Sequence, residues 1–161
     1  MNITTILDVE RVVVNAAPTS KKKTLEFLGN ILCSKFEHLT PQLVTNFLCS
    51  REKLSSTAIG NGVALPHSRL KNINQAVAAL VVLKNPIDFD TLDNQPVDIF
   101  FGLLVPENAC EDHLQILAAV ARLFNEPQNA LHIRSLKTSQ QVFDFACQAL
   151  NHTEPGLKGT G

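Results

Sequence analysis

The chain has 161 residues, of which 45% are hydrophobic and 18% are charged. This length fits one ordinary domain with a substantial core, whereas two domains would be cramped. The 14 basic and 15 acidic residues leave a formal net charge of −1, so the composition gives no general attraction to nucleic acid or to anionic lipid. Any anion-binding site must therefore be a local feature.

The cysteines are scattered and form neither a Cys-x-x-Cys pair nor a Cys-x-His cluster; they are Cys33, Cys49, Cys110 and Cys147. We therefore expect reduced thiols and no metal site. The opening MNITTILDVERVVV lacks the basic-then-apolar layout of a secretion signal, and the longest apolar run, 76–83, is too short to cross a bilayer. The sequence predicts a cytoplasmic protein with no direct membrane insertion and no nucleic-acid partner.

The first part of the chain predicts one strand and two helices. Residues 6–14 end in Val12-Val13-Val14, a β-branched run that favours a strand before the loop 15–18. Ser20 is placed to cap a helix whose apolar residues recur at helical spacing: Leu25, Leu28, Ile31 and Leu32. Thr40-Pro41 opens a second helix, expected to end near Arg51, with one apolar face formed by Leu43, Val44, Phe47 and Leu48.

The remaining chain alternates predicted strands and helices. A short strand is expected at 63–65, and the nearly continuous apolar runs 76–83 and 97–105 are typical of strands covered on both faces. Apolar spacing predicts a helix over about 111–124, ended by Asn125-Glu126-Pro127, and a short helical stretch after it.

Thr138 and Gln141 form a capping box for a last helix that runs through Leu150. We therefore expect a single three-layer α/β domain over residues 1–150 and a flexible tail over 151–161.

The stretch GNGVALPHS, residues 60–68, places His67 after a glycine turn, a short strand and a stiff proline. A histidine held in this way suits acid–base chemistry or nucleophilic attack on phosphorus. Nearby hydroxyls and main-chain N–H groups favour phosphorus because they can bind an anion; they belong to Ser55, Ser56, Thr57 and the turn Gly60-Asn61-Gly62. Arg51 offers a cationic fork for phosphoryl oxygens.

These residues also have ordinary structural explanations. A proline-histidine step after a strand is common in structural turns, and Arg51 at a helix end is favourable to the helix dipole. His113 opens an amphipathic helix, where a polar surface residue is usual. The residues alone therefore leave a structural turn and a phosphoryl site both open.

Several separated motifs together are similar to one family. The run from Arg51 to His67, REKLSSTAIGNGVALPH, resembles the active-site signature of enzyme IIA of the fructose/mannitol type in the phosphoenolpyruvate-dependent phosphotransferase system. The nitrogen-regulatory branch, enzyme IIA-Ntr, is the most similar. Further matches follow in order at 86–89, 93–98, 103–106 and His113-Leu114, so the resemblance covers roughly residues 3–150.

The resemblance implies a mixed β-sheet flanked by helices on both faces and a role as a phosphotransferase component. In this family His67 would be the phosphorylated nucleophile, His113 would position it or stabilise the charged group, and Arg51 would assist the phosphoryl oxygens. The expected phosphate-binding residues are Ser56, Thr57, Gly60, Asn61 and Gly62. Ser68 departs from the very small residue usual after the histidine, and its side chain would narrow the partner's approach or add a hydrogen bond to the phosphate.

The implied partners are a nitrogen-type HPr-like phosphocarrier, which donates the phosphoryl group, and regulated target proteins such as transporters or sensor kinases. No nucleotide loop of the form G-x-x-x-x-G-K-[ST] occurs, and we expect no cofactor. Two alternatives stay open: a detached sugar-transport IIA that passes phosphate to a IIB domain, and a protein-binding module in which His67 is never phosphorylated.

Overall fold

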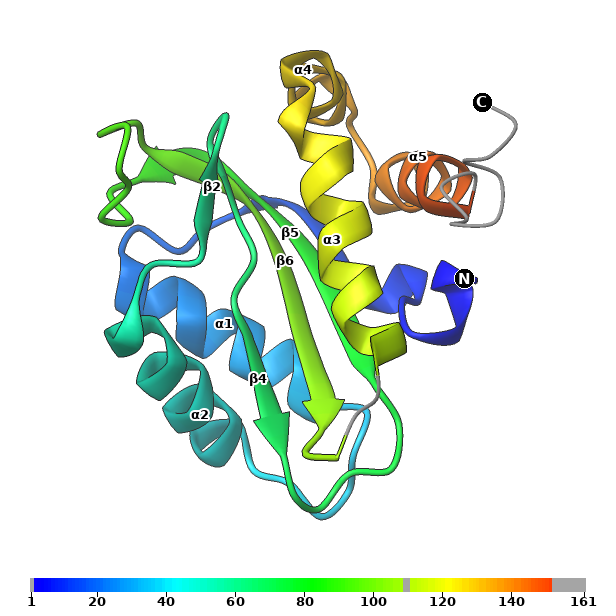
Figure 1. Ribbon diagram of the computed structural model, residues 1–161. Coiled ribbons are helices and arrows are strands. Elements are labelled where there is room, and N and C mark those ends of the chain that lie inside the picture. The colour runs from blue at the N-terminus through cyan, green and yellow to red at the C-terminus, as the bar shows by residue number, and fades with distance from the viewer. Residues whose placement is uncertain (1, 109–110, 152–161) are drawn as a thin grey trace.

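A mixed β-sheet runs through the middle of the molecule with helices on both sides (Figure 1). The computed structural model describes residues 2–108 and 111–151, without the side chains of Asp112 and His113. The strands follow the order β1-β5-β6-β3-β2, and β4 also pairs with β6. Their bounds are β1 Val12–Ala16, β2 Ala58–Gly60, β3 Val63–Ala64, β4 His67–Leu70, β5 Val77–Ile87 and β6 Val97–Pro106.

The long central pair β5 and β6 is antiparallel, while β1 runs parallel to β5, and β3 and β4 run parallel to β6. Helices α1 (Lys21–Cys33) and α2 (Pro41–Leu54) cover one face of the sheet (Figure 1). Helices α3 (Glu111–Asn125), α4 (Pro127–Ser135) and α5 (Ser139–Asn151) pack on the other. The predicted three-layer α/β fold is confirmed.

Strand β5 shows why the sequence builds two cores. Successive side chains on a strand point to opposite faces. Ala78 and Leu80 therefore join the core under α3 and α5, whereas Ala79 and Val81 join the core under α1 and α2. Both sets are buried, which explains the nearly continuous apolar run in the sequence.

The predicted helix starts are confirmed by their caps. The Ser20 side chain accepts a hydrogen bond from the N–H of Lys23, and Thr40 accepts one from Leu43. In the capping box, the N–H of Gln141 donates to Thr138 Oγ1 at 3.1 Å, and the N–H of Thr138 donates to Gln141 Oε1 at 3.2 Å. Each cap satisfies main-chain N–H groups that the first helical turn leaves unpaired.

The structure corrects the beginning of the chain. In the segment 6–14, predicted to end as a strand, β1 starts only at Val12, because a short 3₁₀ helix occupies Val9–Arg11; another 3₁₀ helix lies before the segment, at Ile3–Thr5. The side chains of Asn2 and Asp8 accept hydrogen bonds from main-chain N–H groups of these two turns. This local hydrogen bonding favours the turns over an extended strand.

Helix α2 also differs from the prediction, because it continues to Leu54 instead of ending near Arg51. Leu43 and Phe47 are each 40% exposed, so the buried face is narrower than expected and is formed by Val44 and Leu48. Apart from Asn151, the last residue of α5, the predicted tail 151–161 lies outside the described residues.

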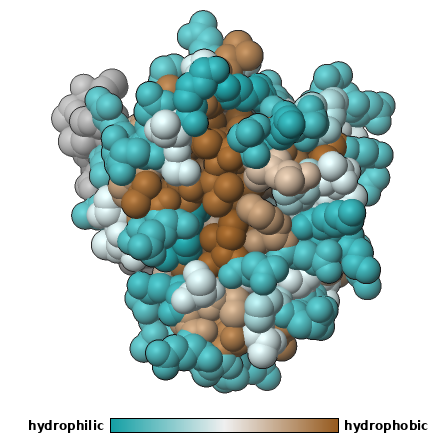
Figure 2. Space-filling model, turned by 180° about the vertical axis from the view of Figure 1, so that it is seen from behind, coloured by the Kyte–Doolittle hydropathy of each residue, from teal (hydrophilic) through white to brown (hydrophobic). Residues whose placement is uncertain are grey.

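The reverse side of the molecule, where β1 is the outer strand, carries a strip of hydrophobic residues between hydrophilic margins (Figure 2). Val13 and Val14 of this edge strand are only partly buried. In the part of the chain that the structure describes, no helix has the length and hydropathy needed to cross a membrane.

Candidate functional site

His67 is the first residue of β4 and lies opposite Leu103 of β6. The segment before it is fixed on both sides: the N–H of Leu103 donates to the carbonyl of Pro66, and the N–H of Leu65 donates to the carbonyl of Thr57, each at 3.0 Å. Main-chain bonds at Leu65 and at Pro66 hold the backbone that leads into the histidine. The stiff backbone predicted before His67 is therefore held in place by main-chain hydrogen bonds.

The imidazole ring of His67 has one defined orientation. Its Nδ1 lies 2.6 Å from the carbonyl oxygen of Leu65. A carbonyl oxygen only accepts hydrogen bonds, so Nδ1 carries the proton and the lone pair of the neutral ring lies on Nε2. In the part of the chain that the structure describes, which excludes the side chains of Asp112 and His113, no hydrogen bond engages Nε2. A neutral ring in this orientation is able to act as a nucleophile through Nε2.

Burial is the largest cause that lowers the pKa of His67 below its ordinary value of 6.5, and the positive charge of Arg51 acts in the same direction. The hydrogen bond to Leu65 and the negative charge of Glu52 oppose this shift. Because the net pKa is lowered, the ring is neutral at neutral pH, and a neutral imidazole is the form that attacks an electrophile.

A surface pocket of about 340 Å³ opens over His67. One wall is apolar and comes from α3; the other comes from the end of α2 and from the segment around β2. The lining residues are Arg51, Ser56, Thr57, Ala58, Ile59, Leu65, His67, Leu117, Ala118 and Ala121. The pocket thus combines the imidazole of His67 and the guanidinium of Arg51 with apolar side chains.

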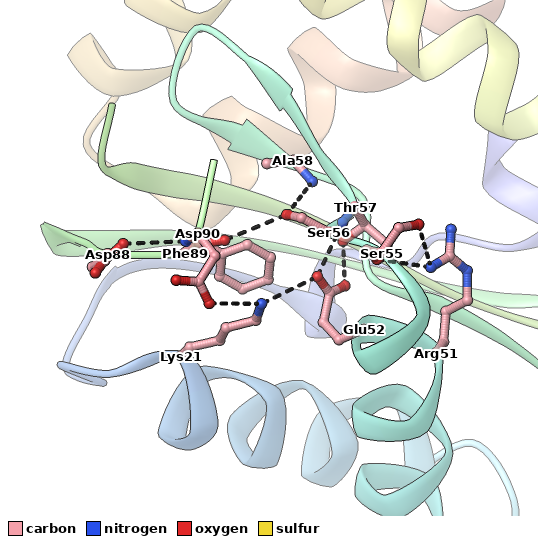
Figure 3. A network of polar contacts seen from close by, with 10 residues as sticks. All are labelled: Lys21, Arg51, Glu52, Ser55, Ser56, Thr57, Ala58, Asp88, Phe89 and Asp90. Atoms are coloured by element: carbon pink, nitrogen blue, oxygen red, sulfur yellow. Dashed lines mark hydrogen bonds and ion pairs between the residues drawn. The ribbon is translucent and has the colours of Figure 1, made fainter. Parts of the chain in front are cut away.

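Arg51 reaches this pocket from the last turn of α2. Its Nη1 donates to the carbonyl oxygen of Ser55 at 2.9 Å, so the side chain is tethered at one nitrogen (Figure 3). A guanidinium carries five N–H donors, and this tether leaves others for an anion. The structure therefore brings together two residues singled out in the sequence, Arg51 and His67.

Ser56 and Thr57 line the same pocket, but their hydroxyls already have partners (Figure 3). Ser56 Oγ donates to the carbonyl of Phe89 at 3.3 Å and accepts from the N–H of Ala58 at 3.2 Å. Thr57 Oγ1 donates to the carboxylate of Glu52 at 2.5 Å. Both hydroxyls hold the loop that leads into β2.

The glycine turn lies at a different place. Gly60, Asn61 and Gly62 have φ angles of 94°, 56° and 76°, the left-handed region that explains the two glycines. Asn61 and Gly62 line a second depression of about 370 Å³ together with Asp98 and Arg134. None of the three turn residues is among those that line the pocket over His67.

The backbone of His113 lies in the first turn of α3, and its side chain lies outside the described residues. The predicted contact between His113 and His67 thus stays a prediction. Sequence reasoning missed the wall formed by Leu117, Ala118 and Ala121. The helical spacing of these residues is visible in the sequence, but it predicts only a helix and not the pocket that the helix borders.

Comparison with known proteins shows the family to which the chain belongs. Residues 5–148 match the family described as "Phosphoenolpyruvate-dependent sugar phosphotransferase system, EIIA 2". A nitrogen regulatory protein of Pseudomonas aeruginosa is 37% identical over 146 residues, covering 91% of this chain and 95% of that protein. A fructose-specific EIIA component of Haloferax volcanii is 31% identical over 144 residues, covering 88% of this chain and 94% of that protein.

Solved structures show the same fold. The nitrogen regulatory protein IIA-Ntr of Neisseria meningitidis has a TM-score of 0.84 at 33% identity, covering 92% of this chain and 98% of that one. The mannitol IIA of Escherichia coli has a TM-score of 0.72 at 16% identity, covering 89% of this chain and 97% of that one, and it supports the fold alone. The resemblance seen in the sequence is confirmed: the chain belongs to the EIIA 2 family of the phosphoenolpyruvate-dependent sugar phosphotransferase system.

Proposed function

We propose that the protein is a phosphocarrier that accepts a phosphoryl group on Nε2 of His67 from an HPr-like carrier and acts on its targets through its phosphorylation state. The observation that carries this proposal is the hydrogen bond between Nδ1 of His67 and the carbonyl of Leu65. This bond fixes the tautomer and leaves the Nε2 lone pair in a pocket beside Arg51.

The proposed transfer exchanges one phosphorus–nitrogen bond for another. The bond between phosphorus and the imidazole of the donor carrier breaks, and the donor ring keeps the electron pair. The Nε2 lone pair of His67 forms the new bond, while the proton on Nδ1 stays in the hydrogen bond to Leu65. No external acid or base is needed, so positioning and charge stabilisation account for the catalysis.

Arg51 supplies the nearby positive charge for the phosphoryl oxygens in this proposal. His113 is proposed to support the ring or the phosphate from the start of α3. Ser56 and Thr57 line the pocket and stay predicted neighbours of the phosphate. Gly60, Asn61 and Gly62 were also predicted to bind the phosphate, but they lie outside the pocket over His67. They would contact the phosphate or its donor only if either extends beyond that pocket.

The regulatory part of the proposal is supported by the names of the relatives. The similar proteins from Pseudomonas aeruginosa and Neisseria meningitidis are called nitrogen regulatory proteins, and each aligns over nearly its whole length. A phosphoryl group adds about −1.5 to −2 charges at one point of the surface, enough to change which partners bind. Transporters and sensor kinases are the target classes that we propose.

The similarity to a fructose-specific EIIA component supports a second candidate function, a sugar-transport IIA. Such a protein would pass its phosphoryl group to a IIB domain. Incubation of the phosphorylated protein with a sugar-specific IIB separates the two functions. Transfer to IIB supports sugar transport, and retention of the phosphate supports regulation.

Intact-protein mass spectrometry tests the proposed function directly. The protein is incubated with phosphoenolpyruvate, enzyme I and an HPr-type carrier, as wild type, as His67→Gln and as the control His132→Gln in α4. We expect wild type and the control to gain one acid-labile phosphate and His67→Gln to gain none. Uptake by His67→Gln, or no uptake by wild type, contradicts the proposal.

A further inference from the structure

We propose that Glu52 is a positioning residue for His67 and acts through the main chains of Thr57 and Leu65. The inference rests on the proposed function, because it concerns the same imidazole ring. Glu52 does not line the pocket over His67, and its carboxylate contacts Thr57 instead.

Glu52 is a buried carboxylate near the end of α2, and its side chain is only 3% exposed. Its Oε1 accepts the N–H of Thr57 at 3.0 Å, and its Oε2 accepts the Thr57 hydroxyl (Figure 3). Lys21 Nζ lies 3.5 Å from Oε1. A buried charge is costly unless it is paired and hydrogen-bonded, so these three contacts hold the carboxylate in a single position.

A continuous chain of contacts leads from this carboxylate to the imidazole. Thr57 is held by Glu52 at its N–H, and its carbonyl accepts the N–H of Leu65 at 3.0 Å. The carbonyl of Leu65 is the acceptor for Nδ1 of His67. Thr57 and Leu65 are 6% and 5% exposed, so water has little access to replace these bonds. A shift of Thr57 therefore moves the group that orients the ring.

Glu52 acts at the start of the hairpin formed by β2 and β3. These strands have only three and two residues, and their pairing is irregular between Ala58 and Gly60. The bonds from Glu52 to Thr57 fix the start of this short hairpin on the end of α2. Its negative charge also opposes the lowering of the His67 pKa.

Asp90 provides a matched control for the experiment. Lys21 lies between Glu52 and Asp90, with Nζ 3.6 Å from Asp90 Oδ2 and 4.4 Å from the centre of the Phe89 ring. The Asp90 side chain is 78% exposed, so this outer ion pair contributes little. Asp90→Asn removes a carboxylate from the same network without touching Thr57.

The test is ¹⁵N-histidine NMR of the unphosphorylated protein as wild type, Glu52→Gln and Asp90→Asn, combined with the rate of phosphate uptake. In wild type and Asp90→Asn we expect the Nδ1-protonated tautomer of His67 and uptake rates that agree within about twofold. In Glu52→Gln we expect a mixture of tautomers, a changed pKa and uptake slowed by about tenfold, because small misplacement of a nucleophile is costly. An unchanged tautomer, pKa and rate in a folded Glu52→Gln protein overturn the inference.

A second pair of variants covers the case in which Glu52→Gln does not fold. Thr57→Val removes the hydroxyl link to Glu52, whereas Thr57→Ser keeps it. We expect Thr57→Val to mix the tautomers of His67 and Thr57→Ser to retain the Nδ1-protonated form; identical spectra for the two overturn the inference. If wild type takes up no phosphate, the proposed function fails, but the tautomer comparison still decides the role of Glu52.

Discussion

At His67, one hydrogen bond and one desolvated environment act on the same ring. Burial and Arg51 favour the neutral imidazole, and the carbonyl of Leu65 decides which nitrogen carries the proton. The first effect makes a lone pair available at neutral pH, and the second directs it to Nε2. Neither effect alone would prepare an oriented nucleophile.

The lowered pKa of His67 predicts how stability changes with pH. Because the folded pKa lies below the unfolded value of about 6.5, the unfolded chain binds the proton first as the pH falls. This contribution to stability is complete above pH 6.5 and is lost progressively below it, down to the folded pKa. Urea unfolding at pH 7.5 and at pH 5 should show a larger loss for wild type than for His67→Gln. Equal losses in the two proteins would contradict the predicted direction.

The residues of the site differ in how well the sequence revealed them. His67 and Arg51 stood out because the motif around them is specific, and the structure places both at one pocket. Glu52 did not, since a glutamate near a helix end is usually a solvated charge. Its importance depends on Thr57, in the loop after α2, and on Lys21 of α1, and both contacts are set by how the loop and α1 lie against the end of α2.

At the scale of elements, the β2–β3 hairpin depends on a clamp from α4. Arg134 Nε lies 3.0 Å and 2.9 Å from the two carboxylate oxygens of Asp98, and its Nη2 donates to the carbonyl of Asn61 at 2.7 Å. Both side chains of the ion pair are largely buried, at 29% and 16% exposed. The turn is thus tied to β6 and to α4 at once.

Removal of this clamp should destabilise the protein. We expect Arg134→Ala to lower the free energy of unfolding by about 1–3 kcal/mol, because it removes charged hydrogen bonds and leaves Asp98 partly buried without its partner. Arg122→Ala, an exposed arginine of α3, is the control and should change the free energy by less than about 0.5 kcal/mol. Chemical denaturation measures both, and equal effects would argue against the clamp.

The packing of α1 on α2 gives a further prediction at this scale. Alanine usually stabilises a helix relative to glycine, but a Cβ at Gly29 would collide with Thr45 Oγ1 and lie 3.2 Å from the carbonyl of Pro41. Gly29→Ala should therefore cost about 1–3 kcal/mol in the free energy of unfolding. The double variant Gly29→Ala/Thr45→Ala should be less destabilised than the sum of its single changes. A simple sum in thermal or urea unfolding would show that the two residues do not collide.

The sequence predicts the long helices and strands better than the short ones. The central strands and the capped helices were recognised because each repeats its pattern over many residues. Strands β2 and β4 were missed, since three or four residues carry no clear period and their pairing with β3 and β6 is non-local. His67 follows the short strand β3, as predicted, but it also begins β4, which the sequence did not indicate.

At the scale of the whole molecule, two cores share a single sheet. Leu28 belongs to the core under α1 and α2, and Phe124 belongs to the core under α3 and α5. Residues of β5 and β6 supply both cores from alternate positions, so loss of either core disturbs the same central strands. We therefore expect the two layers to unfold together.

This coupling is tested by Leu28→Ala and Phe124→Ala, which remove side chains that are 0% and 2% exposed. Each should cost about 2–5 kcal/mol and shift one shared transition, whichever layer is observed. The chain has no Trp and no Tyr, so methyl NMR signals from each core are the suitable probes. Leu131→Ala, at a position that is 61% exposed, is the control. Separate transitions for the two layers would contradict a single cooperative unit.

The apolar wall that α3 forms beside His67 also affects how long a phosphoryl group would stay on the protein. A phosphohistidine is hydrolysed when water reaches the phosphorus, and Leu117, Ala118 and Ala121 line the pocket in which we propose that the phosphoryl group is held. On that proposal, these apolar side chains limit the access of water and so set how long the protein retains its phosphate. Substitutions along this face of α3 offer a way to change the persistence of the signal without changing the residue that carries it.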